Sequence, residues 1–119
     1  MATGSTEELV DSLLVELRRG TLVLSVLSQM GHPEYGYSLA QKLEEKDAVI
    51  EPGTLYPLLR RLEKQNLLVS RWDTSESRPR KYYELSEEGK EVYERLKEEW
   101  LNLARKLNVL IGGENDGTD

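Results

Sequence analysis

The sequence contains no cysteine, no phenylalanine and a single histidine, His32. Without cysteine the chain can form neither disulfides nor thiolate metal sites, and the lack of disulfides is compatible with a reducing cytoplasm. No stretch of 18 apolar residues and no signal-like leader is present, so we expect neither a membrane span nor secretion. His32 stands beside Pro33 without a second ligand at metal-binding spacing. We therefore expect no metal and no other cofactor.

The sequence also lacks the local motifs of common enzyme classes. It contains no glycine-rich phosphate loop and no catalytic serine motif. Glu44 and Glu45, like the glutamates near the C-terminus, fit solvated faces better than an acid–base pair, because no pocket or nucleophile accompanies them. We therefore expect a binding protein rather than an enzyme.

Positive charge is scarce overall but concentrated in one segment. The chain of 119 residues has a net charge of −6, and its length supports one compact domain with a helical extension. Residues 60–81 hold seven basic and three acidic groups, whereas segments 1–59 and 82–119 are each net acidic. Because salt screens charges beyond about 10 Å, the local sign decides contact with a polyanion. One cationic face on an anionic body is expected.

Helical patterns cover the first half of the chain. Ser5 and Glu8 fit a capping box, and apolar residues at helical spacing continue to about residue 30, with an interruption at Gly20. We expect one kinked helix or two consecutive helices there, followed by a shorter helix over 36–46. A lone monomer of this size buries a modest share of its surface, so a dimer would complete the core.

A further helix is predicted from Pro52, which suits the first helical position. Its leucines recur at i, i+3, i+4 and i+7 and form one buried face: Leu55, Leu58, Leu59 and Leu62. The opposite face is glycine-containing and basic: Gly53, Arg60, Arg61 and Lys64, with Thr54 and Tyr56 at its borders. Pro57 removes the hydrogen bond to the Gly53 carbonyl, so a loosened helix start is expected.

A basic β-hairpin follows this helix. Asn66 suits a left-handed turn, and the predicted strands span 67–72 and 80–85, with a long polar turn at 73–79. The ribbon concentrates four basic residues beside the helix: Arg71, Arg78, Arg80 and Lys81. A helix followed at once by a basic hairpin is the arrangement with which a winged helix grips duplex DNA.

The last predicted helix carries a heptad seam. Ser86 suits its N-cap, and Gly112 and Gly113 end it. Six apolar residues spaced 3, 4, 3, 4, 3 form the seam of an expected homodimer: Tyr93, Leu96, Trp100, Leu103, Leu107 and Leu110. Trp100 is either an ordinary interface aromatic or, near a twofold axis, a surface on which flat hydrophobic ligands stack.

These elements predict a mainly α fold with a small β-hairpin. We expect a winged helix-turn-helix DNA-binding domain over 6–85, a C-terminal dimerisation helix over 86–111 and a disordered tail over 112–119. The protein is predicted to bind double-stranded DNA as a cytoplasmic homodimer. The alternative is a winged-helix module whose wing docks on an acidic protein partner. Selectivity for one palindromic site would separate the two.

Three motifs carry a resemblance to the PadR family of transcriptional regulators, in its short members with a single C-terminal helix. They are Tyr35-Gly36-Tyr37, Gly53-Thr54-Leu55-Tyr56-Pro57-Leu58-Leu59 with Arg61-Leu62-Glu63, and Arg78-Pro79-Arg80-Lys81-Tyr82-Tyr83-Glu84-Leu85-Ser86 through Gly89. The resemblance spans roughly 6–111. Asn66 and Ser86 replace the family's usual glycine and threonine but keep the required chemistry.

The resemblance implies a homodimeric winged helix-turn-helix regulator, usually a repressor that binds operators near promoters and is released by small molecules. The last helix would pack against the partner's last and first helices, which adds Leu13 and Leu17 to the expected interface. Trp100 resembles the tryptophan that stacks flat aromatic compounds in multidrug-binding members. The expected DNA contacts are Tyr37, Gly53, Thr54, Tyr56, Arg60, Arg61, Lys64, Arg78, Arg80 and Lys81.

Overall fold

The computed structural model describes residues 2–112 and is mainly helical, with a small three-stranded antiparallel sheet. Its elements are α1 (Ala2–Arg19), α2 (Leu22–Ser28), β1 (Glu34–Tyr35), α3 (Gly36–Glu45), α4 (Pro52–Lys64), β2 (Leu68–Asp73), β3 (Arg80–Leu85) and α5 (Glu87–Ile111). The predicted fold class is confirmed. Of the predicted disordered tail, only Gly112 is described, with a left-handed φ of 110° that ends α5; the rest lies outside the described residues.

The first two helices are separate, which was one of the two expected arrangements. The break falls at Gly20 and Thr21, where the Thr21 hydroxyl donates to the Arg18 carbonyl at 2.8 Å. The predicted start of the first helix is wrong. α1 begins at Ala2, and because the residues before Ser5 continue the helical backbone, Ser5 lies within the helix and does not cap it. Within residues 2–112, no helix combines the length and apolarity needed to cross a lipid bilayer.

The hydrophobic core lies between α2, α3, α4 and the sheet. Its buried residues are Val26, Leu27, Met30, Leu39, Leu43, Ile50, Leu55, Leu58, Leu59, Leu62, Leu68 and Tyr83. The predicted leucine face of α4 is thus confirmed. Burying one leucine contributes about 1.5–3 kcal/mol relative to exposing it, so this face fixes the rotation of α4 about its axis. α4 runs unbroken through Pro57, and the predicted loosened start is therefore wrong.

The sheet has the strand order β1-β3-β2, with both pairs antiparallel. The hairpin of β2 and β3 is the expected one, and we call it the wing. The short strand β1 was not predicted, because two residues are too few to show an alternating pattern. It pairs Tyr35 with Tyr82, and these rings pack edge to face with centroids 5.3 Å apart.

A tight junction joins the end of α4 to the start of α5. Asn66 has a φ of 65° after the end of α4, as predicted. The Ser86 hydroxyl caps α5 by accepting from the Gly89 amide at 2.8 Å, and it donates to the Asn66 carbonyl at 2.6 Å. A β-carbon on Gly89 would lie 2.0 Å from the Leu67 carbonyl oxygen. Only glycine therefore permits this close approach.

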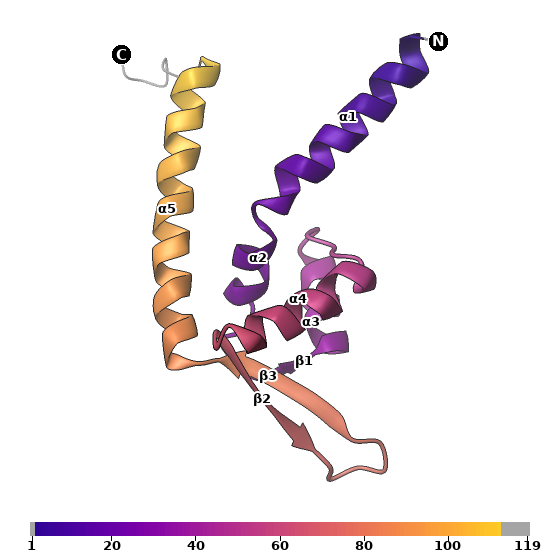
Figure 1. The fold of residues 1–119 in the computed structure, drawn as a ribbon, viewed down its shortest axis with the longest axis vertical. Coiled ribbons are helices and arrows are strands. Elements are labelled where there is room, and N and C mark those ends of the chain that lie inside the picture. Colours follow the sequence, from indigo (N-terminus) through magenta and orange to yellow (C-terminus); the bar gives the residue numbers. More distant parts are fainter. Residues whose placement is uncertain (1, 113–119) are drawn as a thin grey trace.

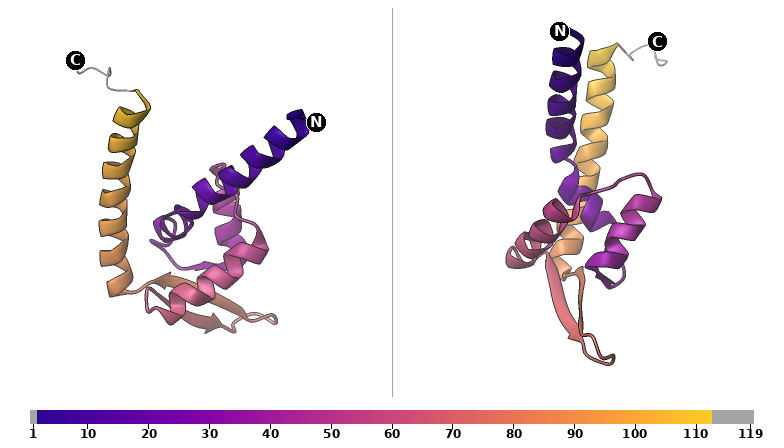
Figure 2. Two further views of the ribbon diagram at one scale, coloured as in Figure 1. Left: turned by 45° about the horizontal axis from the view of Figure 1, so that its top comes forward. Right: turned by 90° about the vertical axis from the view of Figure 1, so that its right-hand side faces the viewer.

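The long helices and the wing lie on opposite sides of the helical body. Figure 1 shows α1 and α5 projecting on one side and diverging from each other, while the wing extends on the other side. Figure 2 shows the same separation after rotation. The molecule thus has two distinct ends, one made by a pair of diverging helices and one by α4 and the wing.

Candidate nucleic-acid interface

The side of α4 opposite its leucines is exposed along its length. This surface, which we call the basic face, consists of the exposed residues Gly53, Thr54, Tyr56, Pro57, Arg60, Arg61 and Lys64. All six residues that the sequence predicted on this helix as DNA contacts lie on it. The side chains of Arg60, Arg61 and Lys64 are therefore exposed to solvent. None of them belongs to an ion pair among the described residues.

A close contact positions Tyr56 at the edge of the basic face. A β-carbon on Gly36 would lie 2.1 Å from the Tyr56 ring, so the glycine allows that ring to rest on the first turn of α3. Tyr37 follows directly and is 60% exposed, and its hydroxyl oxygen accepts from Gln41 Nε2 at 3.2 Å. The structure thus brings Tyr56 of α4 against the first turn of α3, where the exposed Tyr37 also lies.

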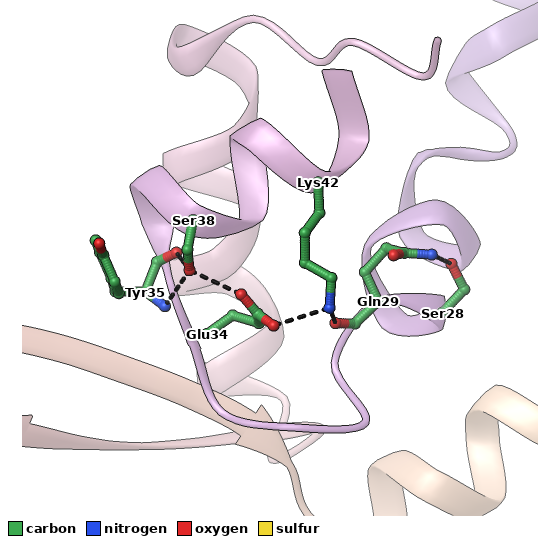
Figure 3. Close-up of polar contacts among 6 residues, drawn as sticks. All are labelled: Ser28, Gln29, Glu34, Tyr35, Ser38 and Lys42. Atoms are coloured by element: carbon green, nitrogen blue, oxygen red, sulfur yellow. Dashed lines mark hydrogen bonds and ion pairs between the residues drawn. The ribbon is translucent and has the colours of Figure 1, made fainter. Parts of the chain in front are cut away.

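Figure 3 shows how α3 is fixed to the elements before it. The Tyr35 amide donates to the Ser38 hydroxyl oxygen at 3.1 Å, and that hydroxyl donates to Glu34 Oε1 at 2.7 Å. Lys42 Nζ lies 2.8 Å from Glu34 Oε2 and 3.5 Å from the Gln29 carbonyl oxygen at the end of α2. These contacts tie α2, β1 and α3 together and hold α3 in place beside α4.

The wing is fastened to α4 through one carboxylate. Glu63 accepts from the Ser70 hydroxyl at 2.5 Å and lies 3.2 Å from Lys81 Nζ. The Ser70 hydrogen bond, followed by the Lys81 ammonium, holds the pKa of Glu63 below its ordinary value despite partial burial. The same contact with Glu63 raises the pKa of Lys81. Lys81 is thus partly neutralised within the protein, which the sequence analysis missed.

Arg80 and Lys81 lie on opposite faces of the wing. Successive side chains on a strand alternate between faces, and Lys81 points to the side of α4. Arg80 points to the other side, where its guanidinium lies 4.6 Å from the centre of the Tyr35 ring. The two side chains therefore present their positive charges on different sides of the wing. Arg78 is exposed in the turn at the wing tip, and Arg71 pairs with Glu84 at 3.0 Å.

The predicted seam of α5 is largely exposed in the single chain. Leu96, Trp100, Leu103, Leu107 and Leu110 are all exposed, as are Leu13 and Leu17 on α1. Tyr93 differs, because it packs against the core of its own chain. The sequence could not separate Tyr93 from the seam, since its spacing fits both roles.

Trp100 lines three hollows, and two of them show how its side chain is placed. One, of about 400 Å³, is lined by Leu17 of α1 together with Trp100, Leu103 and Leu107 of α5. The other, of about 410 Å³, lies between α2 and α5, with Tyr93, Lys97 and Trp100 on the α5 side. Trp100 therefore stands where apolar groups from two helices converge.

Comparison with known proteins agrees with this arrangement. Residues 23–95 match the transcriptional regulator PadR-like family. The chain is 32% identical over 101 residues to the transcriptional regulator Rv3488 of Mycobacterium tuberculosis, and the match covers 84% of this chain and 92% of that protein.

Solved structures of similar proteins share this fold over most of the chain. A PadR family transcriptional regulator from Eggerthella lenta superposes with a TM-score of 0.84 at 45% identity, over 91% of this chain and 96% of its own. A PadR-like transcriptional regulator from Bacillus cereus gives a TM-score of 0.72 at 30% identity, over 83% and 99%. The predicted resemblance is confirmed: the chain belongs to the PadR-like family of transcriptional regulators.

Proposed function

We propose that the protein binds a palindromic DNA operator as a homodimer and represses transcription there. The observation that carries this proposal is the continuity of the basic face of α4 with the wing, on a chain whose other segments are acidic. α4 enters the major groove, where Thr54, Tyr56 and Arg60 meet base edges and phosphates. The wing follows the neighbouring backbone with Arg78, Arg80 and Lys81.

The cations of the interface differ in how freely they can reach phosphate. Arg60, Arg61 and Lys64 are exposed and unpaired among the ion pairs of residues 2–112. Lys81 is shared with Glu63, and Arg80 is stacked on Tyr35. The three cations of α4 are therefore expected to contribute more to phosphate binding than the two of β3.

The exposed leucines of α1 and α5 support the homodimer. Leu17 is 69% exposed and Leu103 is 49% exposed, and a soluble single chain rarely leaves such a row of leucines in water. A partner's α5 placed between the diverging α1 and α5 covers both rows. Twofold symmetry then directs one α4 to each half of a palindrome.

Trp100 supports a small hydrophobic effector. Its side chain is 44% exposed and borders both hollows described above. In the proposed dimer the two copies of these hollows face one central space. A flat aromatic molecule held there between indole rings alters the packing of α5 and releases the operator.

Selection of DNA tests the proposal. The full chain is incubated with a random-sequence duplex library, and the retained duplexes are sequenced. One palindromic site is expected, and its affinity should fall steeply as salt rises. Retention of no sequence above background, or equal affinity for every duplex, would contradict specific operator binding and favour the protein-interaction alternative.

A double substitution within α4 sharpens the same test. Arg60→Ala with Lys64→Ala should flatten the dependence of log affinity on log salt by about two per protomer, because each phosphate contact contributes about 0.9. Arg105→Ala, at an exposed position on the distant half of α5, is the matched control and should leave the slope unchanged.

A further inference from the structure

Trp72 is a large apolar side chain left in water on the wing. It lies on β2, which packs beside α4, yet its side chain is 63% exposed. The pairing of the strands determines its direction. Trp72 stands opposite Lys81, two residues beyond Ser70 on β2, so the three side chains share one face of the wing.

That face is the one turned towards α4. Ser70 and Lys81 both contact Glu63 of α4, and Trp72 lies about 7 Å further along the strand than Ser70. Figure 1 shows the wing of β2 and β3 extending away from the helical body. Trp72 therefore borders the space between the wing and the basic face, with no core residue over it.

The charge around Trp72 indicates what kind of molecule it contacts. Lys81 lies directly across the hairpin from Trp72, on the same face of the wing. The segment 60–81 as a whole carries seven basic and three acidic groups. A cationic setting is complementary to a polyanion, whereas the exposed leucines of the dimer surface lie on α1 and α5, on the other side of the body.

We propose that Trp72 packs its indole ring against the sugars of duplex DNA beside the groove that α4 occupies. The ring supplies apolar contact to the deoxyribose faces, while Lys81, on the same face of the wing, meets a flanking phosphate. Since sugars are the same at every step, this contact adds affinity for all duplexes and little preference among sequences. The inference rests on the proposed DNA-binding function and adds a residue to it.

The two tryptophans of the chain allow a direct test. In the full chain carrying Trp100→Phe, Trp72 is the sole tryptophan. Its quenching by acrylamide is measured with and without a mixed-sequence duplex of about 30 base pairs, long enough for two half-sites one turn apart. Binding of the duplex is followed separately by anisotropy. DNA should protect Trp72 and lower its quenching constant at least twofold.

Affinity provides the second readout. Trp72→Ala should weaken binding about tenfold for every duplex, as expected for loss of one aromatic contact with nucleic acid. The matched control is Val69→Ala. Val69 is also exposed on β2, at 49%, but faces the opposite side of the wing, and its loss should change affinity less than twofold. Thermal melting of both variants checks that they fold.

The outcomes separate the two proposals. Duplex binding with unchanged Trp72 quenching, or equal effects of Trp72→Ala and Val69→Ala, overturns the role of Trp72 and leaves DNA binding intact. Absence of duplex binding by the parent chain, with both tryptophans present, overturns both. Protection of Trp72 by polyglutamate but not by the duplex overturns the proposal in favour of an acidic protein partner.

Discussion

Gly89 has no β-carbon, and the β-carbon of any other residue at this position would lie 2.0 Å from the Leu67 carbonyl oxygen. The oxygen cannot move freely, because it accepts from the Ser86 amide at 3.1 Å. The neighbouring Asn66 carbonyl is held by the Ser86 hydroxyl. The position of α5 relative to α4 thus depends on one residue without a side chain.

Gly89→Ala should destabilise the protein by about 1–3 kcal/mol, since the added methyl group forces backbone to shift. Urea unfolding followed by tryptophan fluorescence measures the loss. Gly53→Ala is the matched control, because Gly53 also lies in the first turn of a helix but has no neighbouring atom within 4 Å of the added carbon. It should be neutral or slightly stabilising. Equal unfolding midpoints for the two variants would refute the close approach.

The wing and α4 behave as one element because Glu63 binds both Ser70 and Lys81. Folding lowers the pKa of Glu63, chiefly through the Ser70 hydroxyl. The carboxylate form therefore stabilises the folded state at pH values above its ordinary pKa of 4.5. This contribution disappears as the pH falls through the lowered value. The pKa of Lys81 is raised from 10.5, so Lys81 remains charged throughout that range.

Glu63→Gln should therefore lower stability near neutral pH and have little effect in acid, where Glu63 of the parent chain is itself protonated. Unfolding in urea at both pH values gives the comparison. Glu94→Gln is the control, since Glu94 pairs with Lys97 at 3.2 Å on an exposed stretch of α5. Such a surface pair contributes about 0–1 kcal/mol. A deficit of the Glu63 variant that is as large in acid as at neutral pH would contradict this account.

Elements with a strong periodic pattern were predictable. The four leucines of α4 determine its buried face, and local capping chemistry located Ser86 and Asn66. Strand β1 was not predictable, since its pairing with β3 depends on residues nearly fifty positions away.

The sequence predicted which residues form the candidate site better than it predicted where their side chains point. The opposite directions of Arg80 and Lys81 follow from strand alternation, a signal that the sequence contained. Their partners Tyr35 and Glu63 come from other elements, however, and only the tertiary structure brings them together. The fit of Gly36 under Tyr56 is of the same kind.

On the scale of the whole molecule, the surfaces proposed for DNA reading and for self-association lie at different ends. The basic face and the wing lie opposite the diverging helices α1 and α5. A change in the seam should therefore act on DNA binding only through the dimer.

Leu103→Glu should dissociate the homodimer, because the proposed interface cannot bury an unpaired carboxylate without cost. Sedimentation velocity over a range of concentrations reports the change. Arg105→Glu makes a larger change in charge on the opposite side of α5 and should remain dimeric. A Leu103→Glu protein that sediments as the parent does would exclude the seam as the interface.

The helix α5 is 25 residues long, about 37 Å at 1.5 Å per residue. It leaves the body where Gly89 meets Leu67, and Tyr93 packs its base against the core. It acts as a lever arm. A tilt of α5 by about 5° at its base moves its far end by about 3 Å. Conversely, a ligand that displaces α5 near Trp100 tilts the helix at its base. In the proposed homodimer, the distance between the two α4 helices thus depends on how rigidly the Gly89 contact and the packing of Tyr93 hold the base of α5.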